Sequence, residues 1–206
     1  MSNISVAEPT QTQDNLELPD YVIWDDLDPT KSAVLRTPAK KIIFPLSADD
    51  QKDIDKLISK YDHEASCSGL AAPQIGIGKS IIIFAAEDPS IKKWRPDFTQ
   101  TMPKTLWINP PYEPIGEEVH EDYEACFSVK GMAGLVKRYK QIDYQAYNRE
   151  GDLVEGKAEG FLARIIQHEI DHLNGILFID LVDKNELMSI EEYRKRRSAL
   201  IEQQIS

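Results

Sequence analysis

The sequence predicts an α+β fold in which short strands joined by hairpins surround one buried helix. Residues from about 160 to 173 place apolar and histidine side chains at helical spacing. Residues 136–147 and 153–158 alternate well enough to be two strands, and Asn148-Arg149-Glu150-Gly151-Asp152 between them is typical of a hairpin turn. Because strands joined by hairpins run antiparallel, an α+β arrangement is favoured over a parallel sheet.

The first half of the chain predicts one helix and two strands. Residues 1–18 are polar, and we expect them to be a disordered or loosely attached lead. A helix is expected to begin after Ser47, which has the side chain of an N-cap, and to end near Asp62. Strands are expected at 80–85 and at 105–109. The buried stripe of the helix would be Ile54, Leu57, Ile58 and Tyr61.

The second half predicts the buried helix and one further helix. Asn174-Gly175 marks the C-cap of the buried helix. After Asp183, a last helix is expected from about 186 to 203. We therefore expect a lead at 1–18, one folded domain at 19–183 and a C-terminal helix at 184–206.

Composition narrows the class of protein. The chain has 206 residues, 41% hydrophobic and 29% charged, which suits a single globular domain. Its formal net charge of −11 argues against binding to DNA or to an anionic membrane surface. No apolar run is long enough for a transmembrane helix, and the first basic residue is Lys31, so a secretory signal is not expected. A cytoplasmic location fits best.

Two histidines in Gln167-His168-Glu169-Ile170-Asp171-His172 carry the first chemical signal. Four residues apart on a helix, His168 and His172 face the same side and can hold one divalent ion. Glu169 beside them would serve as general base for a water molecule. The same face would be buried in any fold, however, and buried histidines can be hydrogen-bonded without a metal. On this motif alone, both interpretations stay open.

Cys126 is a candidate for a third ligand. With two imidazoles, its thiolate would form a four-coordinate site that keeps one position open, as hydrolysis requires. The competing interpretation is a small buried hydrophobe. Cys67 is the only other cysteine, so a disulfide is conceivable, but a metal-binding or catalytic thiol suits a reducing cytosol better.

Three motifs, taken together and in order, resemble the peptide deformylases. They are Gly69-Leu70-Ala71-Ala72-Pro73-Gln74, Glu124-Ala125-Cys126-Phe127-Ser128 and Gln167-His168-Glu169-Ile170-Asp171-His172-Leu173. The resemblance covers roughly residues 34–183. It implies antiparallel β-sheets packed around a central metal-binding helix, with residues 19–183 as the catalytic domain. The implied activity removes the formyl group from the N-terminal formyl-methionine of newly made polypeptides and releases formate.

The resemblance also implies roles for the matched residues. Cys126, His168 and His172 would hold the metal, typically Fe(II), which nickel, cobalt or the less active zinc can replace. Glu169 would be the acid and base of catalysis. Two hydrogen-bond donors would stabilise the oxyanion: the Gln74 amide and the Phe127 backbone N–H. Without the other motifs, Gln74 would be taken as a turn residue after Pro73.

Three more residues are expected near the substrate. Gly69 would line the peptide groove through its backbone, and Ala125 lies where the substrate backbone approaches. Glu124 is also placed among the substrate-binding residues. It could instead orient a metal ligand or a basic residue such as Arg138, or be a solvated carboxylate.

Departures from the family pattern leave an alternative open. The family usually has Gly at the positions of Cys67 and Ala125, Leu at Phe127, and Pro at Lys130 and Lys137. The Ala125 methyl could narrow the groove or oppose a positive φ, and the Cys67 thiol could be oxidised or compete for metal. The alternative is a catalytically impaired relative that binds peptide N-termini or the ribosome without efficient turnover. A metalloprotease is disfavoured because the third ligand follows the deformylase pattern.

A basic run near the C-terminus suggests one further partner. Residues 194–197 are all Arg or Lys and could contact ribosomal RNA near the nascent-chain exit. Glu191 and Glu192 beside them favour an ordinary solvated helix face.

Overall fold

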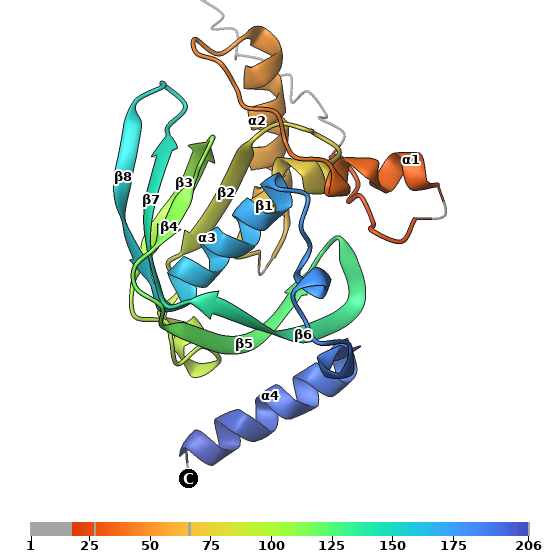
Figure 1. The fold of residues 1–206 in the computed structure, drawn as a ribbon, viewed down its shortest axis with the longest axis vertical. Helices are drawn as coiled ribbons and strands as arrows, with labels where there is room; N and C mark the ends of the chain where they lie inside the picture. Colours follow the sequence, from red (N-terminus) through yellow and green to blue (C-terminus); the bar gives the residue numbers. More distant parts are fainter. Residues whose placement is uncertain (1–17, 27, 66, 206) are drawn as a thin grey trace, which may run out of the picture.

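A computed structural model describes residues 18–26, 28–65 and 67–205. Its fold is two antiparallel sheets with a central helix, α3, between them (Figure 1). This confirms the predicted α+β class. The expected lead at 1–18 lies outside the described residues, apart from Leu18.

The larger sheet has six strands, all paired antiparallel. Its order is β1-β2-β3-β7-β4, and β8 pairs with β7. The strands are β1 (Gly69–Ala71), β2 (Ile81–Ala86), β3 (Met102–Ile108), β4 (Tyr112–Pro114), β7 (Gln141–Tyr147) and β8 (Leu153–Glu159). The two strands predicted in the first half correspond to β2 and β3, and the predicted hairpin joins β7 to β8.

The smaller sheet has the order β5-β6-β9. Its strands are β5 (Val119–Cys126), β6 (Val129–Tyr139) and β9 (Met188–Ser189). A turn at Phe127 and Ser128 joins β5 to β6, and the pairing register shifts between Ala125 and Cys126.

The prediction of one strand at 136–147 is wrong. The chain leaves the smaller sheet after Tyr139 and enters the larger one at Gln141. At the crossing, the Lys140 N–H donates to Glu118 O and the Lys140 carbonyl accepts from Gly160 N–H. Alternation of side chains continues through such a crossing, so periodicity alone does not reveal it.

Helix α3 (Gly160–Leu173) is buried over most of its length and begins where the chain turns sharply out of β8. Gly160 has a φ of 57°, and a Cβ there would lie 2.1 Å from Asp97 O, so a side chain would be excluded. Leu162 and Ile166 are fully buried, and each such side chain contributes about 1.5–3 kcal/mol on burial. Gly175, with a φ of 75°, follows the helix end, as predicted.

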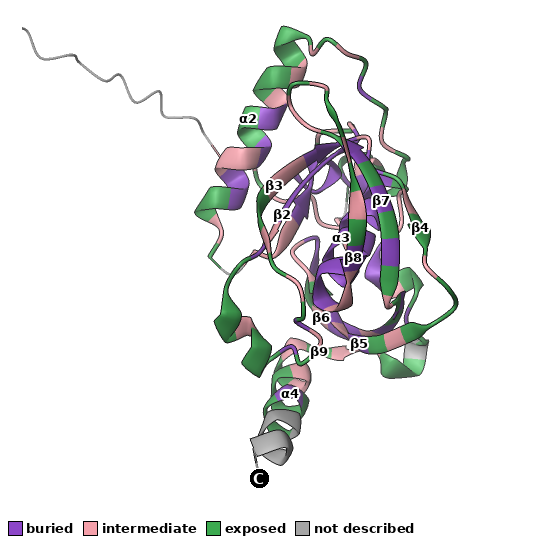
Figure 2. Ribbon diagram, turned by 90° about the vertical axis from the view of Figure 1, so that its left-hand side faces the viewer, coloured by how far each residue is buried: buried purple, intermediate pink, exposed green. Residues whose placement is uncertain are grey.

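Helix α2 (Ala48–His63) packs on the larger sheet with the residues of β1 and β2. Ser47 caps it as predicted, and Asp50 completes a capping box. Ile54, Leu57 and Tyr61 are buried, and Ile58 is half-buried. Figure 2 shows this inward stripe and the exposed outer face of the helix.

The remaining helices are short, except the last. Helix α4 (Ile190–Ile205) follows β9 and extends away from the sheets (Figure 1). None of the helices in the described ranges is long and apolar enough to cross a membrane. The short helices are α1 (Pro29–Ser32), η1 (Ala33–Arg36), η2 (Ala72–Ile75), η3 (Pro89–Lys93), η4 (Phe178–Asp180) and η5 (Lys184–Glu186).

Candidate metal centre

Three side chains from two elements meet beside the central helix. Helix α3 presents His168 and His172, whose ring centroids lie 5.0 Å apart. Cys126 comes from the end of β5, and its Sγ lies 3.3 Å from His172 Nε2. One ligand atom from each residue lies within 4.8 Å of the other two. Cys126 and His172 are 46 positions apart in the sequence, and only the tertiary fold brings them together.

The donor set fits a transition metal. One sulfur and two imidazole nitrogens suit ferrous iron, nickel, cobalt or zinc rather than magnesium or calcium. The pKa of His172 lies well below its usual range, because the ring is buried and close to His168. A neutral ring is the form that binds a metal.

Glu124 orients the His168 ring through a hydrogen bond at Nδ1. Its Oε2 lies 2.8 Å from His168 Nδ1, which leaves Nε2 of that ring for the metal. Arg138 donates two hydrogen bonds of 2.9 Å to the carboxylate, and Arg164 donates a third of 2.8 Å. Burial alone would raise the pKa of Glu124, but the hydrogen bonds from His168 and Arg138 outweigh it and hold this pKa well below its usual range.

Glu124, which we expected among the substrate-binding residues, is poorly accessible from solvent. The residue is only 7% exposed, and both of its carboxylate oxygens already accept hydrogen bonds from buried partners. These contacts favour the alternative that the sequence left open, in which Glu124 orients a candidate metal ligand.

Two charged residues of α3 extend the same network. Asp171 is buried and accepts a hydrogen bond from Arg138. Arg164 was not singled out from the sequence. It lies one turn before His168, and an arginine on that otherwise apolar face was the signal that could have found it.

Glu169 lies beside the ligands and is closely confined. It is 4% exposed, and its Oε2 has no hydrogen-bond partner among the described residues. Burial, more than any nearby charge, raises its pKa to about 7. A carboxyl group with a pKa near neutrality can both accept and return a proton.

Gly69 faces Glu169 directly. A Cβ built on Gly69 would lie 2.4 Å from Glu169 Oε1, far inside van der Waals contact. The glycine is therefore needed at this position for the carboxylate to keep its place. Sequence reasoning assigned Gly69 to the peptide groove and did not foresee this contact.

The Gln74 amide is oriented toward the same centre. Its Oε1 accepts from Ala71 N–H at 2.8 Å, and its Nε2 donates to Cys126 Sγ at 3.2 Å. Gln74 is 2% exposed on η2, so its side chain cannot turn away into solvent. Phe127 follows Cys126 directly at the turn after β5.

Two of the departures from the family pattern, Ala125 and Cys67, are accommodated without strain. Asn109 is the one non-glycine residue with a positive φ in the described part of the chain, so Ala125 does not need a glycine conformation. The Ala125 side chain is exposed. Cys67 donates to Gly69 O at 3.1 Å, and burial raises the pKa of its thiol, which favours the protonated form that metals bind poorly.

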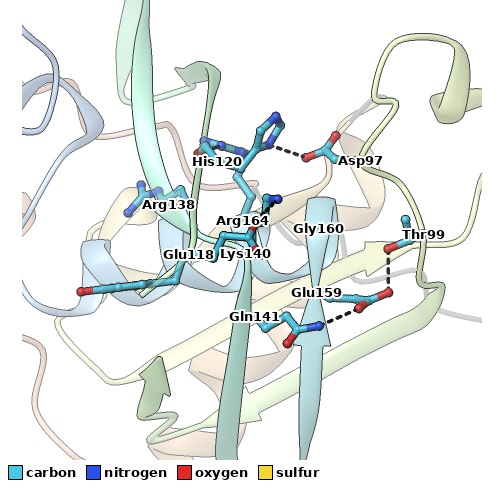
Figure 3. Close-up of a pocket in the computed structure, with 11 residues that line it drawn as sticks. Asp97, Thr99, Glu118, His120, Arg138, Lys140, Gln141, Glu159, Gly160 and Arg164 are labelled. Atoms are coloured by element: carbon cyan, nitrogen blue, oxygen red, sulfur yellow. Dashed lines mark hydrogen bonds and ion pairs between the residues drawn. The ribbon is translucent and has the colours of Figure 1, made fainter. Parts of the chain in front are cut away.

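A separate pocket of about 390 Å³ lies at the N-terminal end of α3 (Figure 3). His120 faces Asp97 there with 3.6 Å between Nδ1 and Oδ2, and Glu159 accepts hydrogen bonds from Thr99 and Gln141. None of the three candidate ligands lines it. Its basic groups already have carboxylate partners, because Lys140 pairs with Glu118 and both arginines pair with Glu124, so they do not indicate a particular ligand.

Comparison with known proteins gives a consistent result. The model of the polypeptide deformylase family matches residues 25–188. Peptide deformylase 2 of Rickettsia conorii is 52% identical over 197 residues, which cover 94% of this chain and 98% of that protein. Peptide deformylase 1 of Prochlorococcus marinus is 45% identical over 119 residues, 56% of this chain and 59% of that protein.

Solved structures show the same fold. A class I type b peptide deformylase from Acinetobacter baumannii, bound to Met-Ala-Ser, has a TM-score of 0.68 at 26% identity and covers 80% of this chain and 98% of its own. The peptide deformylase from Thermotoga maritima has a TM-score of 0.65 at 29% identity, and the match covers 81% of this chain and 98% of that chain. With a family match over most of its length and a relative at 52% identity, the chain belongs to the peptide deformylase family of hydrolases.

Proposed function

We propose that this deformylase removes the formyl group from N-terminal formyl-methionine at the centre formed by Cys126, His168 and His172. The observation that carries the proposal is the meeting of one thiol and two imidazoles next to a buried carboxylate whose pKa is about 7. The A. baumannii relative was solved with Met-Ala-Ser. A peptide that begins with methionine is what deformylation leaves, which supports a formyl-methionyl peptide as substrate here.

Each protein group then has one task. A divalent ion, when bound, supplies Lewis acidity toward water and the formyl oxygen. Glu169 accepts the proton of the attacking water and later gives it to the leaving amine, so that formate and a free N-terminus result. Glu124 keeps His168 in the tautomer whose Nε2 faces the centre.

Two donors are proposed for the oxyanion. The Gln74 amide already points at Cys126, and the backbone N–H of Phe127 comes from the turn that follows it. Such donors are set in place before the reaction, and losing one typically costs about 2.7–4 kcal/mol of barrier. Gly69 and Ala125 are proposed to lie along the bound peptide.

We propose Fe(II) as the metal in the cell. Ferrous iron accepts one thiolate and two imidazoles together with water, and nickel, cobalt and zinc fit the same donor set. Metal content and formate release, measured on the same oxygen-free sample, test both parts. We expect turnover of a formyl-Met peptide with iron or nickel and its loss on chelation. If neither the fully iron-loaded nor the fully nickel-loaded enzyme releases formate, the proposal is contradicted.

The role of Glu169 has its own test. We expect Glu169→Gln to lower formate release by about 10²–10⁴-fold, because the amide cannot accept the proton. Metal content should stay unchanged, since Glu169 is not a proposed ligand. Glu113→Gln is the control, because Glu113 is exposed on β4. A rate for Glu169→Gln close to that of the control would assign the base elsewhere.

The structure gives no support to a catalytically impaired relative. That alternative rested on Ala125, Phe127 and Cys67, and the Ala125 backbone is unstrained while the Cys67 thiol lies outside the ligand group. All proposed ligands, the base and the amide donor are present.

We also propose a cellular location and one further partner, the ribosome. We place the enzyme in the cytoplasm, where newly made polypeptides carry the formyl group. Ribosome contact would depend on Arg194 and Lys195, which are exposed, because Arg196 pairs with Glu192 and Arg197 is buried against Asp122. Replacing Arg194 and Lys195 by Ala should weaken salt-sensitive cosedimentation with ribosomes, and unchanged cosedimentation would dismiss the contact.

A further inference from the structure

An N-terminal segment, residues 18–24, joins the two loops that are proposed to hold the oxyanion donors. The Val22 N–H donates to Gln74 O at 2.8 Å, and the Trp24 N–H donates to Ser128 O at 3.0 Å. Gln74 belongs to η2 and Ser128 to the turn after β5. The segment, which we call the N-terminal strap, thus fastens both loops by backbone hydrogen bonds.

The Tyr21 side chain of the strap lies flat on Phe127. Their ring centroids are 4.8 Å apart and their planes differ by 5°. Lys60 covers the Tyr21 ring, with its Nζ 4.2 Å from the centroid, and is held by Glu64 at 2.9 Å. Tyr21 is therefore enclosed between a buried lysine of α2 and the turn that carries Phe127.

The pairing of β5 with β6 by itself restrains the turn at Phe127 and Ser128 only weakly. The pairing of β5 with β6 shifts register between Ala125 and Cys126, immediately before the turn. A ladder interrupted there restrains Phe127 less than a regular hairpin would. The stack on Tyr21 and the bond from Trp24 to Ser128 supply what the ladder lacks.

We infer that Tyr21 is a positioning residue for deformylation, which acts by holding the Phe127 ring and so fixing the direction of the Phe127 backbone N–H. The inference rests on the proposed role of that N–H. It also gives a reason for the phenylalanine, since a planar ring offers Tyr21 a stacking surface that an aliphatic side chain does not.

Kinetics of three variants test the inference. Tyr21→Ala should lower kcat about tenfold, less than the 10²–10³ typical of losing an oxyanion donor, while KM for a formyl-Met peptide stays within about twofold because ground-state binding is unchanged. Tyr21→Phe should keep the wild-type kcat, because the ring is sufficient. Tyr147→Ala removes another aromatic pair, with Phe44 at 5.4 Å, and should leave kcat unchanged.

Two results would overturn the inference. One is a wild-type kcat in Tyr21→Ala, and the other is an equal loss in Tyr147→Ala, which would indicate general destabilisation. A double-mutant cycle adds a sharper test. If Tyr21 acts through Phe127, then Tyr21→Ala should cause no further loss in a Phe127→Ala background. Losses that multiply would show that Tyr21 acts by another route.

A measurement without turnover separates this inference from the proposed function. Amide hydrogen exchange of residues 124–128 in the metal-loaded enzyme should be about tenfold faster in Tyr21→Ala and unchanged in Tyr147→Ala. If the wild type released no formate, the proposed function would fail, and the exchange rates would still decide whether Tyr21 holds the turn. Equal exchange in wild type and Tyr21→Ala would exclude a positioning role.

Discussion

Buried charges around His168 show how single residues shape this centre. Glu124 accepts hydrogen bonds from two buried arginines and contacts the half-buried His168 ring. Each partner is stabilised only while the others are present, because an uncompensated charge in the interior is costly. The network therefore fixes the orientation of a proposed ligand through charges that never touch the metal.

Glu124→Gln should destabilise the protein by about 3–5 kcal/mol, because Arg164 would lose its carboxylate partner and Arg138 would keep only Asp171. Metal affinity should fall about 10–100-fold, since the His168 ring would face a neutral amide instead of a carboxylate. Urea unfolding and competition with a chelator measure the two effects. The control is Asp62→Asn, which breaks an exposed pair with Lys104 and should cost less than about 1 kcal/mol. Similar losses in both variants would refute the special role of Glu124.

Gly69→Ala tests whether the glycine exists to make room for Glu169. The added methyl would meet Glu169 Oε1 at 2.4 Å, and a displacement of about 1 Å can cost about 10²-fold in rate. We expect formate release to fall by that order. Gly78→Ala is the matched control, because its Cβ would meet only Val34 at an ordinary 3.7 Å. Full activity in both variants would show that the close approach of Gly69 to Glu169 is not required for catalysis.

The start of helix α2 is specified by its own sequence, and its Asp50 also binds a residue outside the helix. Ser47 and Asp50 cap each other, and Asp50 also pairs with Lys79 at 2.7 Å. The hydrogen bond with Lys79, followed by the one with Ser47, lowers the pKa of Asp50 from 3.8 to about 2. A lowered pKa in the folded state means that the ionised form stabilises the fold.

The stability that Asp50 contributes should therefore be fully present above about pH 4 and lost as the pH falls toward 2. The free energy of unfolding of Asp50→Asn, compared with wild type from pH 7 down to pH 2, measures it. The difference between the two proteins should shrink on acidification over this range. A difference that stays constant with pH would mean that the charge of Asp50 is not involved.

The molecule as a whole is held together by contacts between elements distant in sequence. Helix α4 docks on the smaller sheet through Arg197, which donates to both oxygens of Asp122 at 2.7 and 3.1 Å, and through Tyr193, which contacts Tyr123. Strand β9 adds a pairing with β6. We accordingly propose that the expected C-terminal helix at 184–206 is attached to the catalytic unit at 19–183, because β9 pairs within the smaller sheet and Arg197 binds Asp122.

Arg197→Ala should loosen α4 while leaving the metal centre intact. Losing a hydrogen bond between charged groups costs about 1.5–3 kcal/mol, so limited proteolysis within α4 should become about tenfold faster. Formate release should change little, because Arg197 makes no contact with Glu124. Arg196→Ala, which breaks an exposed pair with Glu192, is the control. Equal proteolysis in both variants would show that Arg197 does not anchor the helix.

The sequence by itself determined the local features of this protein. Helical spacing and the cap residues located α2 and α3, and the histidine pair with Glu169 lay on one helix, where geometry follows from spacing alone. The motif that contains Cys126 supplied the proposed third ligand through resemblance. These features needed no knowledge of distant contacts.

Only the tertiary structure decided the long-range partners. It divided residues 136–147 between two sheets, buried Asp171 against Arg138 and placed Glu124 against His168. It also laid Tyr21 on Phe127, more than 100 residues away. The physical reason is that periodicity and caps act within a few residues, whereas a buried charge or ring takes the partner that packing of separate elements brings to it.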